Sequence, residues 1–267
     1  FDAEVKPFEG FIYRQATANP ERHVFTRHGH MLNSILNTHC VDPRAFPNFR
    51  KSAAEFITSS ALQSLVGGLL GEPGTVVQSM YFEGNPATWA HQDTYYLDSE
   101  ELGRMTAAWI ALEDIAPGAG RFYVYPGSHK VELAKNRADY NIASNHATYK
   151  RLVVDAIREH GLECRAPALL KGDVLFWNAR TIHGSLETST PEHSRSSVTA
   201  HYIPRSTRFM QYQKRIRPLA LTWTNGMPLH TPKDQGRLLP RAVLQVEKRY
   251  PRAFAALKGA AIRLVTR

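Results

Sequence analysis

The segment His91-Gln92-Asp93 places an imidazole and a carboxylate two positions apart. In an extended strand, residues i and i+2 face the same side, so His91 and Asp93 can reach one metal ion from a single segment. The triplet alone is a weak signal, because such triplets arise by chance and a lone histidine is more often a structural or surface residue. A second histidine from elsewhere in the chain is needed to complete a metal site.

His183 is the best candidate for that additional ligand. It follows a predicted strand over 173–177 and lies within Thr-Ile-His-Gly-Ser, in a second block of strand-like sequence where a jelly roll folds back. Two histidines and one carboxylate form a facial triad, which leaves coordination positions open on one side of the metal and is diagnostic of non-haem Fe(II) oxygenases. The three residues therefore predict an iron site with room for an oxoacid and dioxygen.

Arg195 provides a cation for the far end of such an oxoacid. A cosubstrate such as 2-oxoglutarate carries a distal carboxylate, and the forked guanidinium of arginine binds carboxylates through two hydrogen bonds. Arg195 lies twelve residues after His183, beyond the turn-like span 187–194, so it can begin a returning strand and point into the same barrel. Ser197 shares that face and adds a hydroxyl. The alternative is an ordinary surface arginine at the end of a loop.

The elements that must position these residues are mostly short strands. Helix-like spacing of apolar residues over 53–70 gives way to short runs rich in β-branched and aromatic residues, with Gly and Pro between them. A polar, helical insertion at about 130–160, with an amphipathic helix over 149–159, separates two strand blocks. In the second block, strands are predicted within 167–177, around a Lys-Gly-Asp turn, and over 196–203.

No internal repeat or linker is evident before about residue 204, so the whole chain, 1–267, is predicted to form one domain. Residues 1–75 read as an N-terminal helical support, 76–204 as the core, and 205–267 as a basic extension that ends in a helix over 240–257. Many short strands in two blocks, with helices before and between them, predict a mainly β fold with helical decoration around a β-sandwich or jelly-roll core.

The composition, 43% hydrophobic and 21% charged residues in 267, is that of a globular protein and excludes a largely disordered chain. The apolar stretches are short and interrupted, so no membrane span is expected. Two cysteines, Cys40 and Cys164, show no metal-ligand spacing and read as reduced thiols. Since no secretory signal is evident either, we expect a cytoplasmic protein.

Charge is distributed very unevenly along the chain. Residues 1–204 hold 19 Lys and Arg against 22 Asp and Glu, whereas 205–267 hold 14 against two, a net charge of +12. Such asymmetry favours an anionic partner, although a solvated face is an equally strong interpretation. No helix-turn-helix, zinc-finger or RNA-binding signature accompanies the charge, so nucleic acid is the less favoured partner.

The chain resembles the phytanoyl-CoA dioxygenase (PhyH) family of Fe(II)- and 2-oxoglutarate-dependent oxygenases, whose members include ectoine hydroxylase. The resemblance covers roughly residues 75–205 and rests on six motifs that occur here in the family's order. These motifs are Ala90-His91-Gln92-Asp93, Ala108–Asp114, Pro126–Lys130, Lys171-Gly172-Asp173, Ile182–Ser185 and Arg195. The fold that the resemblance implies is a double-stranded β-helix, which is a jelly-roll, cupin-like core.

The resemblance also implies a role for each matching residue. His91, Asp93 and His183 would bind Fe(II), and Arg195 would hold the distal carboxylate of 2-oxoglutarate. The residues expected to line the same cosubstrate are Trp109, Ser185, Gln78 and Ser197. At Gln78 the chain departs from the family, which often has a basic residue in that region.

Substrate contacts are expected from residues beside the triad and from the insertion. Thr94 and Tyr96 follow the triad directly, Tyr81 lies on the strand before it, and the segment 135–150 would form a mobile cover. Three further histidines near these motifs are assigned to structure or to the surroundings of the site and are left out of the catalytic set: His129, His193 and His201.

These features predict a dioxygenase that uses Fe(II), 2-oxoglutarate and O2 to hydroxylate an unactivated C–H bond, with release of succinate and CO2. Hydroxylation is the default because Asp93 fills the position that related halogenases leave free for chloride, whereas desaturation, epoxidation and cyclisation use the same oxidant. The expected substrate is a small anionic or carrier-linked molecule of bacterial secondary metabolism, and a homodimer is the candidate assembly. The alternatives are an oxygenase acting on a macromolecule or anionic lipid, and a non-catalytic jelly-roll binding protein.

Overall fold

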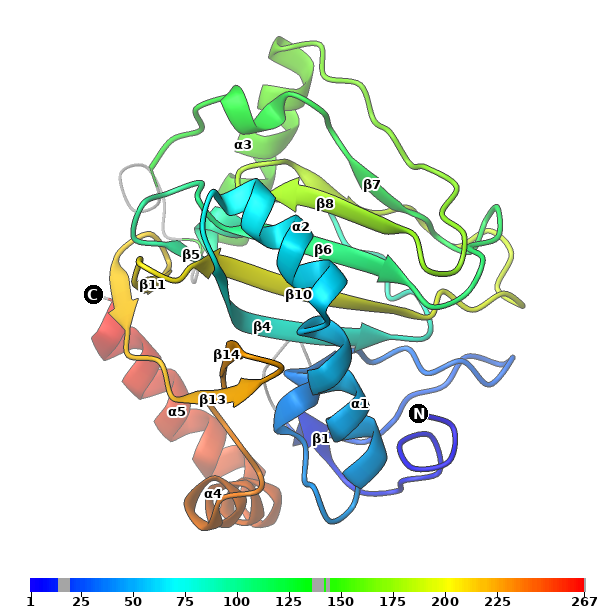
Figure 1. Ribbon diagram of the computed structural model, residues 1–267, viewed down its shortest axis with the longest axis vertical. Coiled ribbons are helices and arrows are strands. Elements are labelled where there is room, and N and C mark those ends of the chain that lie inside the picture. The colour runs from blue at the N-terminus through cyan, green and yellow to red at the C-terminus, as the bar shows by residue number, and fades with distance from the viewer. Residues whose placement is uncertain (14–19, 136–141, 143–144, 267) are drawn as a thin grey trace.

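The fold is organised around one large, mostly antiparallel sheet (Figure 1). The computed structural model describes residues 1–13, 20–135, 142 and 145–266. Seven strands form this main sheet in the order β13-β14-β4-β10-β6-β8, with β3 also paired to β4. Its strands are β3 (Ile35–Leu36), β4 (Gly74–Phe82), β6 (Thr106–Ala111), β8 (Val174–Asn178), β10 (Ser197–Pro204), β13 (Leu221–Thr224) and β14 (Met227–His230). Among the described strands, only β14 and β4 pair in parallel.

Shorter strands pack on the inner face of the main sheet and close the jelly roll. One group pairs β5, β11 and β12, and another pairs β7 with β9. Their bounds, with those of the N-terminal pair β1 and β2, are β5 (Leu97–Ser99), β7 (Phe122–Val124), β9 (His183–Ser185), β11 (Phe209–Gln211), β12 (Arg215–Arg217), β1 (Ile12–Tyr13) and β2 (Pro20–Glu21). The predicted jelly-roll core is therefore confirmed.

Strand β10 shows how alternation separates the two faces of the main sheet. Val198, Ala200 and Tyr202 belong to the large apolar core on the outer face. Since successive side chains in a strand point to opposite faces, the alternate residues from Ser197 to His201 point into the barrel. This inner face supplies the candidate site.

Two helices, α1 (Pro47–Ile57) and α2 (Ser60–Leu70), cover the outer face of the sheet, and α2 crosses in front of it in Figure 1. The sequence predicted one helix over 53–70, and this was wrong. The Thr58 hydroxyl donates to the Ala54 carbonyl at 2.7 Å, and Ser59 is extended, with φ −59° and ψ 150°. A side-chain bond of this kind competes with helix continuation and explains the break.

The insertion contributes helix α3 (His146–Glu159), which begins three residues before the predicted start. Asn145 caps it, because its side chain accepts the backbone N–H of Thr148. Tyr149 and Val153 bury one face of the helix in an apolar cluster beside the candidate site. Of the predicted cover 135–150, residues 136–141 and 143–144 lie outside the described residues.

The C-terminal quarter is more than an extension of the core. Strands β11 to β14 come from it, so the sheets continue past the predicted boundary at 204. The helix predicted over 240–257 is two helices, α4 (Leu238–Arg249) and α5 (Pro251–Thr266). Tyr250 leaves the helical conformation, with φ −130° and ψ 58°, because a residue before proline is disfavoured in the α region.

Two strands were predicted within 167–177, before and after the Lys-Gly-Asp turn. The first prediction was wrong, because residues 167–170 form no strand, and the second strand is β8, which begins at Val174. The preceding residues form a turn in which Gly172 has a φ of +93°, a conformation that favours glycine. As for membranes, none of the helices among the described residues combines the length and the apolar character that a span requires.

Candidate metal centre

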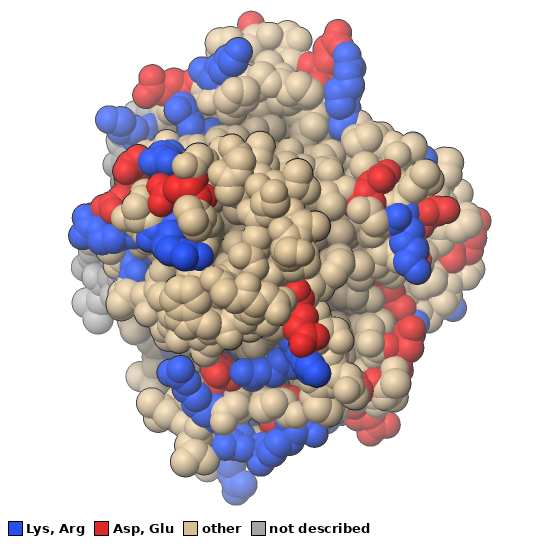
Figure 2. Space-filling model, viewed as in Figure 1, with Lys and Arg blue, Asp and Glu red and all other residues tan. Residues whose placement is uncertain are grey.

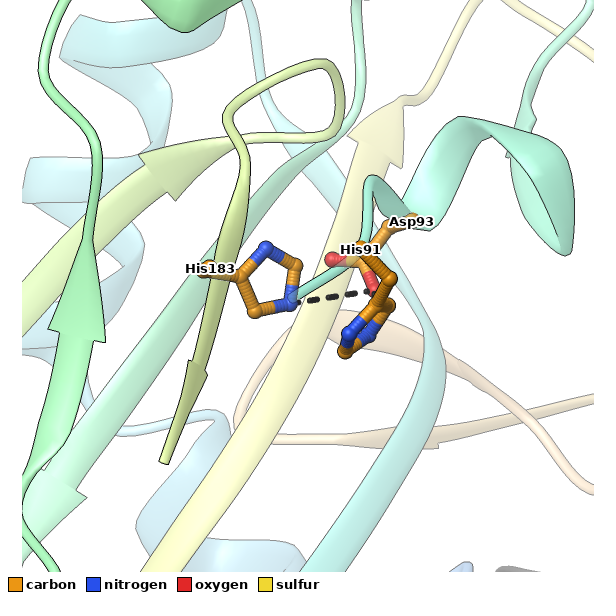
Figure 3. Close-up of side chains that lie close together, drawn as sticks. All are labelled: His91, Asp93 and His183. Atoms are coloured by element: carbon orange, nitrogen blue, oxygen red, sulfur yellow. Dashed lines mark ion pairs between the residues drawn. The ribbon is translucent and has the colours of Figure 1, made fainter. Parts of the chain in front are cut away.

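The structure brings His91, Asp93 and His183 together from two distant segments (Figure 3). His91 and His183 form an isolated β-bridge, with their backbone groups hydrogen-bonded in both directions at 3.0 and 2.9 Å. Asp93 begins the 3-10 turn η2 (Asp93–Tyr95) rather than lying in a strand. Gln92 between them is extended, with φ −109° and ψ 135°, so the two side chains still face the same side.

The nitrogen and oxygen atoms that could bind a metal converge on one point. The Nε2 atoms of His91 and His183 lie 3.7 and 3.5 Å from Oδ1 of Asp93, and one ligand atom from each residue lies within 4.8 Å of the others. Each histidine places Nδ1 2.9 Å from a backbone carbonyl, that of Trp89 or that of Thr181. With Nδ1 donating to these carbonyls, both Nε2 atoms keep a free lone pair for a metal.

The second carboxylate oxygen of Asp93 is held from the opposite side. Nε1 of Trp177 donates to Oδ2 at 2.9 Å, and Nε2 of His201 lies 3.4 Å from the same oxygen. Burial alone would raise the pKa of Asp93, but the charges and hydrogen bonds of His183 and His201 hold it well below its usual range. Asp93 is therefore an ionised carboxylate whose Oδ1 faces the two histidines.

His201 was left out of the catalytic set in the sequence analysis, yet it contacts the candidate ligand Asp93. Its signal was present, because it lies four residues after Ser197 and so on the same face of the same strand. Its Nδ1 is buried with no hydrogen-bond partner among the described residues. His129, in the 3-10 helix η3 (Ser128–Lys130), and His193, in a bend, are by contrast exposed.

Arg195 is completely enclosed, with 2% of its surface exposed. It lies just before β10, and its guanidinium carbon is 5.5 Å from the ring centre of Phe82 and 5.9 Å from that of Trp109. Nη1 donates to the Gly120 carbonyl at 3.2 Å, whereas Nε has no partner within the described ranges. Burial lowers the pKa of this guanidinium to about 10, so Arg195 remains a cation at neutral pH.

Aromatic rings connect Arg195 to the metal ligands. Trp109 lies 5.8 Å from Phe122, and Phe122 lies 5.6 Å from His183, between ring centres. None of the ion pairs among described residues involves Arg195. A buried cation without a counter-ion is energetically costly, so this arrangement fits an anionic ligand that bridges the arginine and the metal ligands.

The other residues predicted to line the cosubstrate are placed differently. Ser197 is buried, and its hydroxyl donates to the Arg195 carbonyl at 3.2 Å. Gln78 lies opposite His201 in the pairing of β4 with β10, on the inner face. Ser185 is already engaged, because its hydroxyl donates to Asn85 at 3.0 Å and accepts the Thr88 N–H at 2.7 Å.

Two of the three predicted substrate contacts lie near the triad. Tyr96 packs edge-on against His91, with ring centres 5.8 Å apart, and burial together with the charge of Asp93 raises the pKa of its phenol. Thr94 lies buried within η2. Tyr81 does not join them, because it faces the outer core and stacks on Phe1 at 4.4 Å. Tyr81 is therefore too far on the outer side of the sheet to contact a substrate at the triad.

Close packing around His183 leaves little freedom for the ligand. A Cβ at Gly184 would lie 2.5 Å from both the Thr88 carbonyl oxygen and the Tyr123 hydroxyl, so only glycine fits beside this ligand. Two surface cavities of about 270 Å³ each lie elsewhere, beside α2 and between α1 and β13. None of the three ligands lines either cavity.

The donor set itself fits iron. Two imidazole nitrogens and one carboxylate oxygen on one side of a metal are the protein ligands of non-haem Fe(II) sites. Each of the three candidate ligands also has a hydrogen-bond partner for its other polar atom, which fixes its orientation. His91, Asp93 and His183 would hold the ion, with Arg195 available for the far end of an oxoacid.

Comparisons with known proteins agree with this donor set. The family described as phytanoyl-CoA dioxygenase (PhyH) matches residues 7–197. Phytanoyl-CoA dioxygenase domain-containing protein 1 of Bos taurus is 31% identical over 149 residues, which cover 54% of this chain and 50% of that protein. Its namesake from Danio rerio is 38% identical over 136 residues, covering 48% and 44%. The chain spans about half the length of these curated relatives.

Solved structures share the fold. The non-heme alpha ketoglutarate dependent carbocyclase SnoK from nogalamycin biosynthesis is 21% identical, with a TM-score of 0.52 and 70% of each chain covered. EctD from S. alaskensis with bound Fe is 22% identical, with a TM-score of 0.53, covering 73% of this chain and 65% of that one. Because the family match extends over well more than half of the sequence, the chain belongs to the phytanoyl-CoA dioxygenase family.

Proposed function

We propose that this protein is an Fe(II)- and 2-oxoglutarate-dependent oxygenase that hydroxylates a C–H bond of a small molecule. The observation that carries the proposal is Arg195, a fully buried guanidinium with no carboxylate partner among the described residues, linked through aromatic rings to the His91, Asp93 and His183 cluster. A dicarboxylate that chelates a metal at one end and pairs with arginine at the other satisfies both groups.

Different residues of the chain would bind the metal and orient its ligands. His91, Asp93 and His183 would hold the metal, with Trp177 fixing the orientation of the carboxylate. When bound, Fe(II) and 2-oxoglutarate supply the oxidative chemistry, in which O2 converts the oxoacid to succinate and CO2 and a substrate C–H bond to an alcohol. The protein positions the reactants and keeps the site enclosed.

Residues on the α3 side of the triad support an anionic or carrier-linked substrate. Tyr96 packs against His91, and α3 places His146 6.1 Å from the ring centre of Trp89 and the Lys150 ammonium 5.0 Å from it. A lysine beside aromatic rings suits a carboxylate, phosphate or thioester-linked acyl group. Since the related fold also carries a carbocyclase and an epimerase, product analysis must distinguish hydroxylation from other oxidations.

Anaerobic titration tests the proposal before any substrate is known. Fe(II) followed by 2-oxoglutarate should give the weak visible charge-transfer band of the chelate. His183→Ala should abolish the band, and Arg195→Ala should weaken 2-oxoglutarate binding on the order of 100-fold, as expected for loss of a charge-assisted pair. The exposed residues His129 and Arg165 provide matched controls, and alanine at either should leave the band unchanged.

The alternatives predict different results. No band with the wild-type protein would overturn the oxygenase assignment and favour a non-catalytic binding protein. A band without succinate release from any small molecule, but with release in the presence of nucleic acid or protein, would favour a macromolecular substrate. The basic C-terminal quarter is the feature that supports that second reading.

A further inference from the structure

Helix α4 is anchored to the body of the protein through one narrow face. Leu244 and Glu247 are its buried residues. The Glu247 carboxylate accepts the Tyr13 hydroxyl at 3.1 Å and lies 3.6 Å from the Lys258 ammonium. Pro240, Arg241 and Lys248 are half-buried beside them, and the remaining residues of α4 are exposed.

An apolar stripe runs along the exposed surface of α4, beside the exposed polar residues Gln245 and Arg249. Leu239, Val243, Val246 and Tyr250, which we call the α4 stripe, follow one another at intervals of four, three and four residues. This spacing places Leu239, Val243 and Val246 on one face of α4, and Tyr250 follows directly after the last residue of the helix. Leu239 is 75% exposed, Val246 50% and Tyr250 57%. Large apolar side chains arranged this way rarely face water unless something covers them.

Two further apolar side chains are exposed near the stripe in sequence. Leu238, at the start of α4, is 80% exposed, and Leu257, in α5, is 71% exposed. Exposed apolar residues therefore occur in both helices, on either side of the break at Tyr250.

Exposed basic residues lie next to the α4 stripe in sequence, whereas the acidic residues of 205–267 are buried. Residues 205–267 contain only two acids, Asp234 and Glu247, and both are buried in ion pairs. Arg237, Arg249 and Arg252 are exposed beside the stripe in sequence. Figure 2 shows basic side chains gathered along the lower edge of the molecule, where Figure 1 draws α4.

We propose that α4 and the start of α5 form a docking surface for an anionic lipid membrane, with the α4 stripe buried in the headgroup region and the arginines paired with lipid phosphates. A helix with a continuous apolar face, flanked by basic residues, lies in the plane of a membrane interface. The aliphatic stems of arginine also cover apolar surface while their charged ends reach outward.

Charge complementarity selects this partner over others. A second copy of the chain would bring two equally positive surfaces together, which is unfavourable. Nucleic acid satisfies the charge but leaves the leucines and valines in water. An anionic bilayer satisfies both features at once, because acyl chains take the apolar residues and phosphates take the arginines.

The inference is independent of the proposed function, since it involves none of the candidate iron ligands. Its test is flotation of the metal-free protein, as the whole 267-residue chain, with vesicles. Binding to phosphatidylcholine vesicles that contain phosphatidylglycerol is expected, with little binding to phosphatidylcholine alone and a steep loss on adding salt. A failure here leaves the oxygenase assignment untouched, and the reverse also holds.

Two pairs of variants separate the apolar contribution from the charge. Leu239→Ser with Val246→Ser, and Arg249→Glu with Arg252→Glu, should each lower partitioning on the order of tenfold or more. Leu65 and Leu69 on α2, 52% and 57% exposed, provide the matched control. Serine at both of these positions should leave partitioning unchanged, and circular dichroism verifies the folding of every variant.

Four outcomes would overturn the proposal, and three of them concern vesicle binding and self-association. These are equal binding to neutral and anionic vesicles, binding to anionic vesicles that survives both double variants, and no vesicle binding accompanied by a stripe-dependent dimer in light scattering. Stripe-independent binding to DNA without any vesicle binding would likewise assign the charge to nucleic acid.

Discussion

At the scale of single residues, the indole of Trp177 orients the carboxylate of Asp93. Its Nε1 donates to Oδ2, which leaves Oδ1 turned toward the two histidines. Trp177→Phe removes this donor while keeping an aromatic ring in the cluster. Because partners of metal ligands typically contribute 10- to 100-fold to metal affinity, we expect affinity for Mn(II), measured by calorimetry as an air-stable substitute for Fe(II), to fall by about tenfold or more.

The control for this variant is Trp223→Phe, since Trp223 is a tryptophan on β13 with 61% of its surface exposed. Its metal affinity should equal that of the wild type. An unchanged affinity in Trp177→Phe would mean that His201 alone orients the carboxylate, which lies 3.4 Å from its Nε2.

The sequence predicted the three candidate ligands but not the residues that contact Asp93 from the other strands. His91 and Asp93 are recognisable because their spacing places them on one side of the chain, and the structure groups them with His183 as expected. Trp177 and His201 are contributed by separate strands, β8 and β10. Their approach to Asp93 depends on how the barrel closes, which no local pattern contains.

At the scale of elements, the pair between Arg50 of α1 and Asp234 connects the N-terminal helices to the C-terminal quarter. Nη1 of Arg50 lies 2.6 Å from Oδ1 of Asp234. Burial would raise the pKa of Asp234, but hydrogen bonds from Arg50 and from the Gly236 N–H, with the charge of Arg50, lower it. A carboxyl whose pKa is lowered by folding stabilises the protein above the unfolded pKa and loses that contribution as the pH falls.

Asp234→Asn should therefore lower the free energy of unfolding at pH 7 by about 1–3 kcal/mol, measured by urea denaturation. The difference from wild type should shrink as the pH falls below the unfolded value of 3.8. Glu163→Gln serves as the control, because Glu163 and its partner Arg165 are both exposed and such pairs contribute little. A difference for Asp234→Asn that does not change with pH would show that shape, not charge, stabilises this contact.

Element boundaries were predicted less well than element types. Helical character over 53–70 and 240–257 was correct, but each segment contains two helices. At residue 58 a threonine hydroxyl bonds back to its own helix, and at residue 250 the following proline disfavours the α region. Both breaks have local causes, whereas the return of β14 to the main sheet beside β4 is a long-range pairing that periodicity cannot predict.

At the scale of the whole molecule, the candidate metal centre joins segments that are far apart in the sequence. His91 and Asp93 follow β4, whereas His183 lies in β9, beyond the insertion that carries α3. A metal that binds this arrangement binds the folded chain and not the unfolded one, so it stabilises the fold by mass action. The jelly roll is what brings the two segments together, and the sequence predicted this fold class but not the order of its strands.

Anaerobic Fe(II) at about 100 times its Kd should stabilise the protein by roughly 2.7 kcal/mol, which raises the Tm on the order of 5 °C for a chain of this size. Differential scanning fluorimetry under nitrogen measures the shift. His183→Ala should lose it, whereas alanine at the exposed His193 should keep it. Adding 2-oxoglutarate should raise the Tm further only in the presence of the metal, and Arg195→Ala should remove that second increment while retaining the first. An equal Fe(II) shift in the His183 variant would place the bound iron elsewhere on the protein, because a site without its second imidazole cannot keep the same affinity.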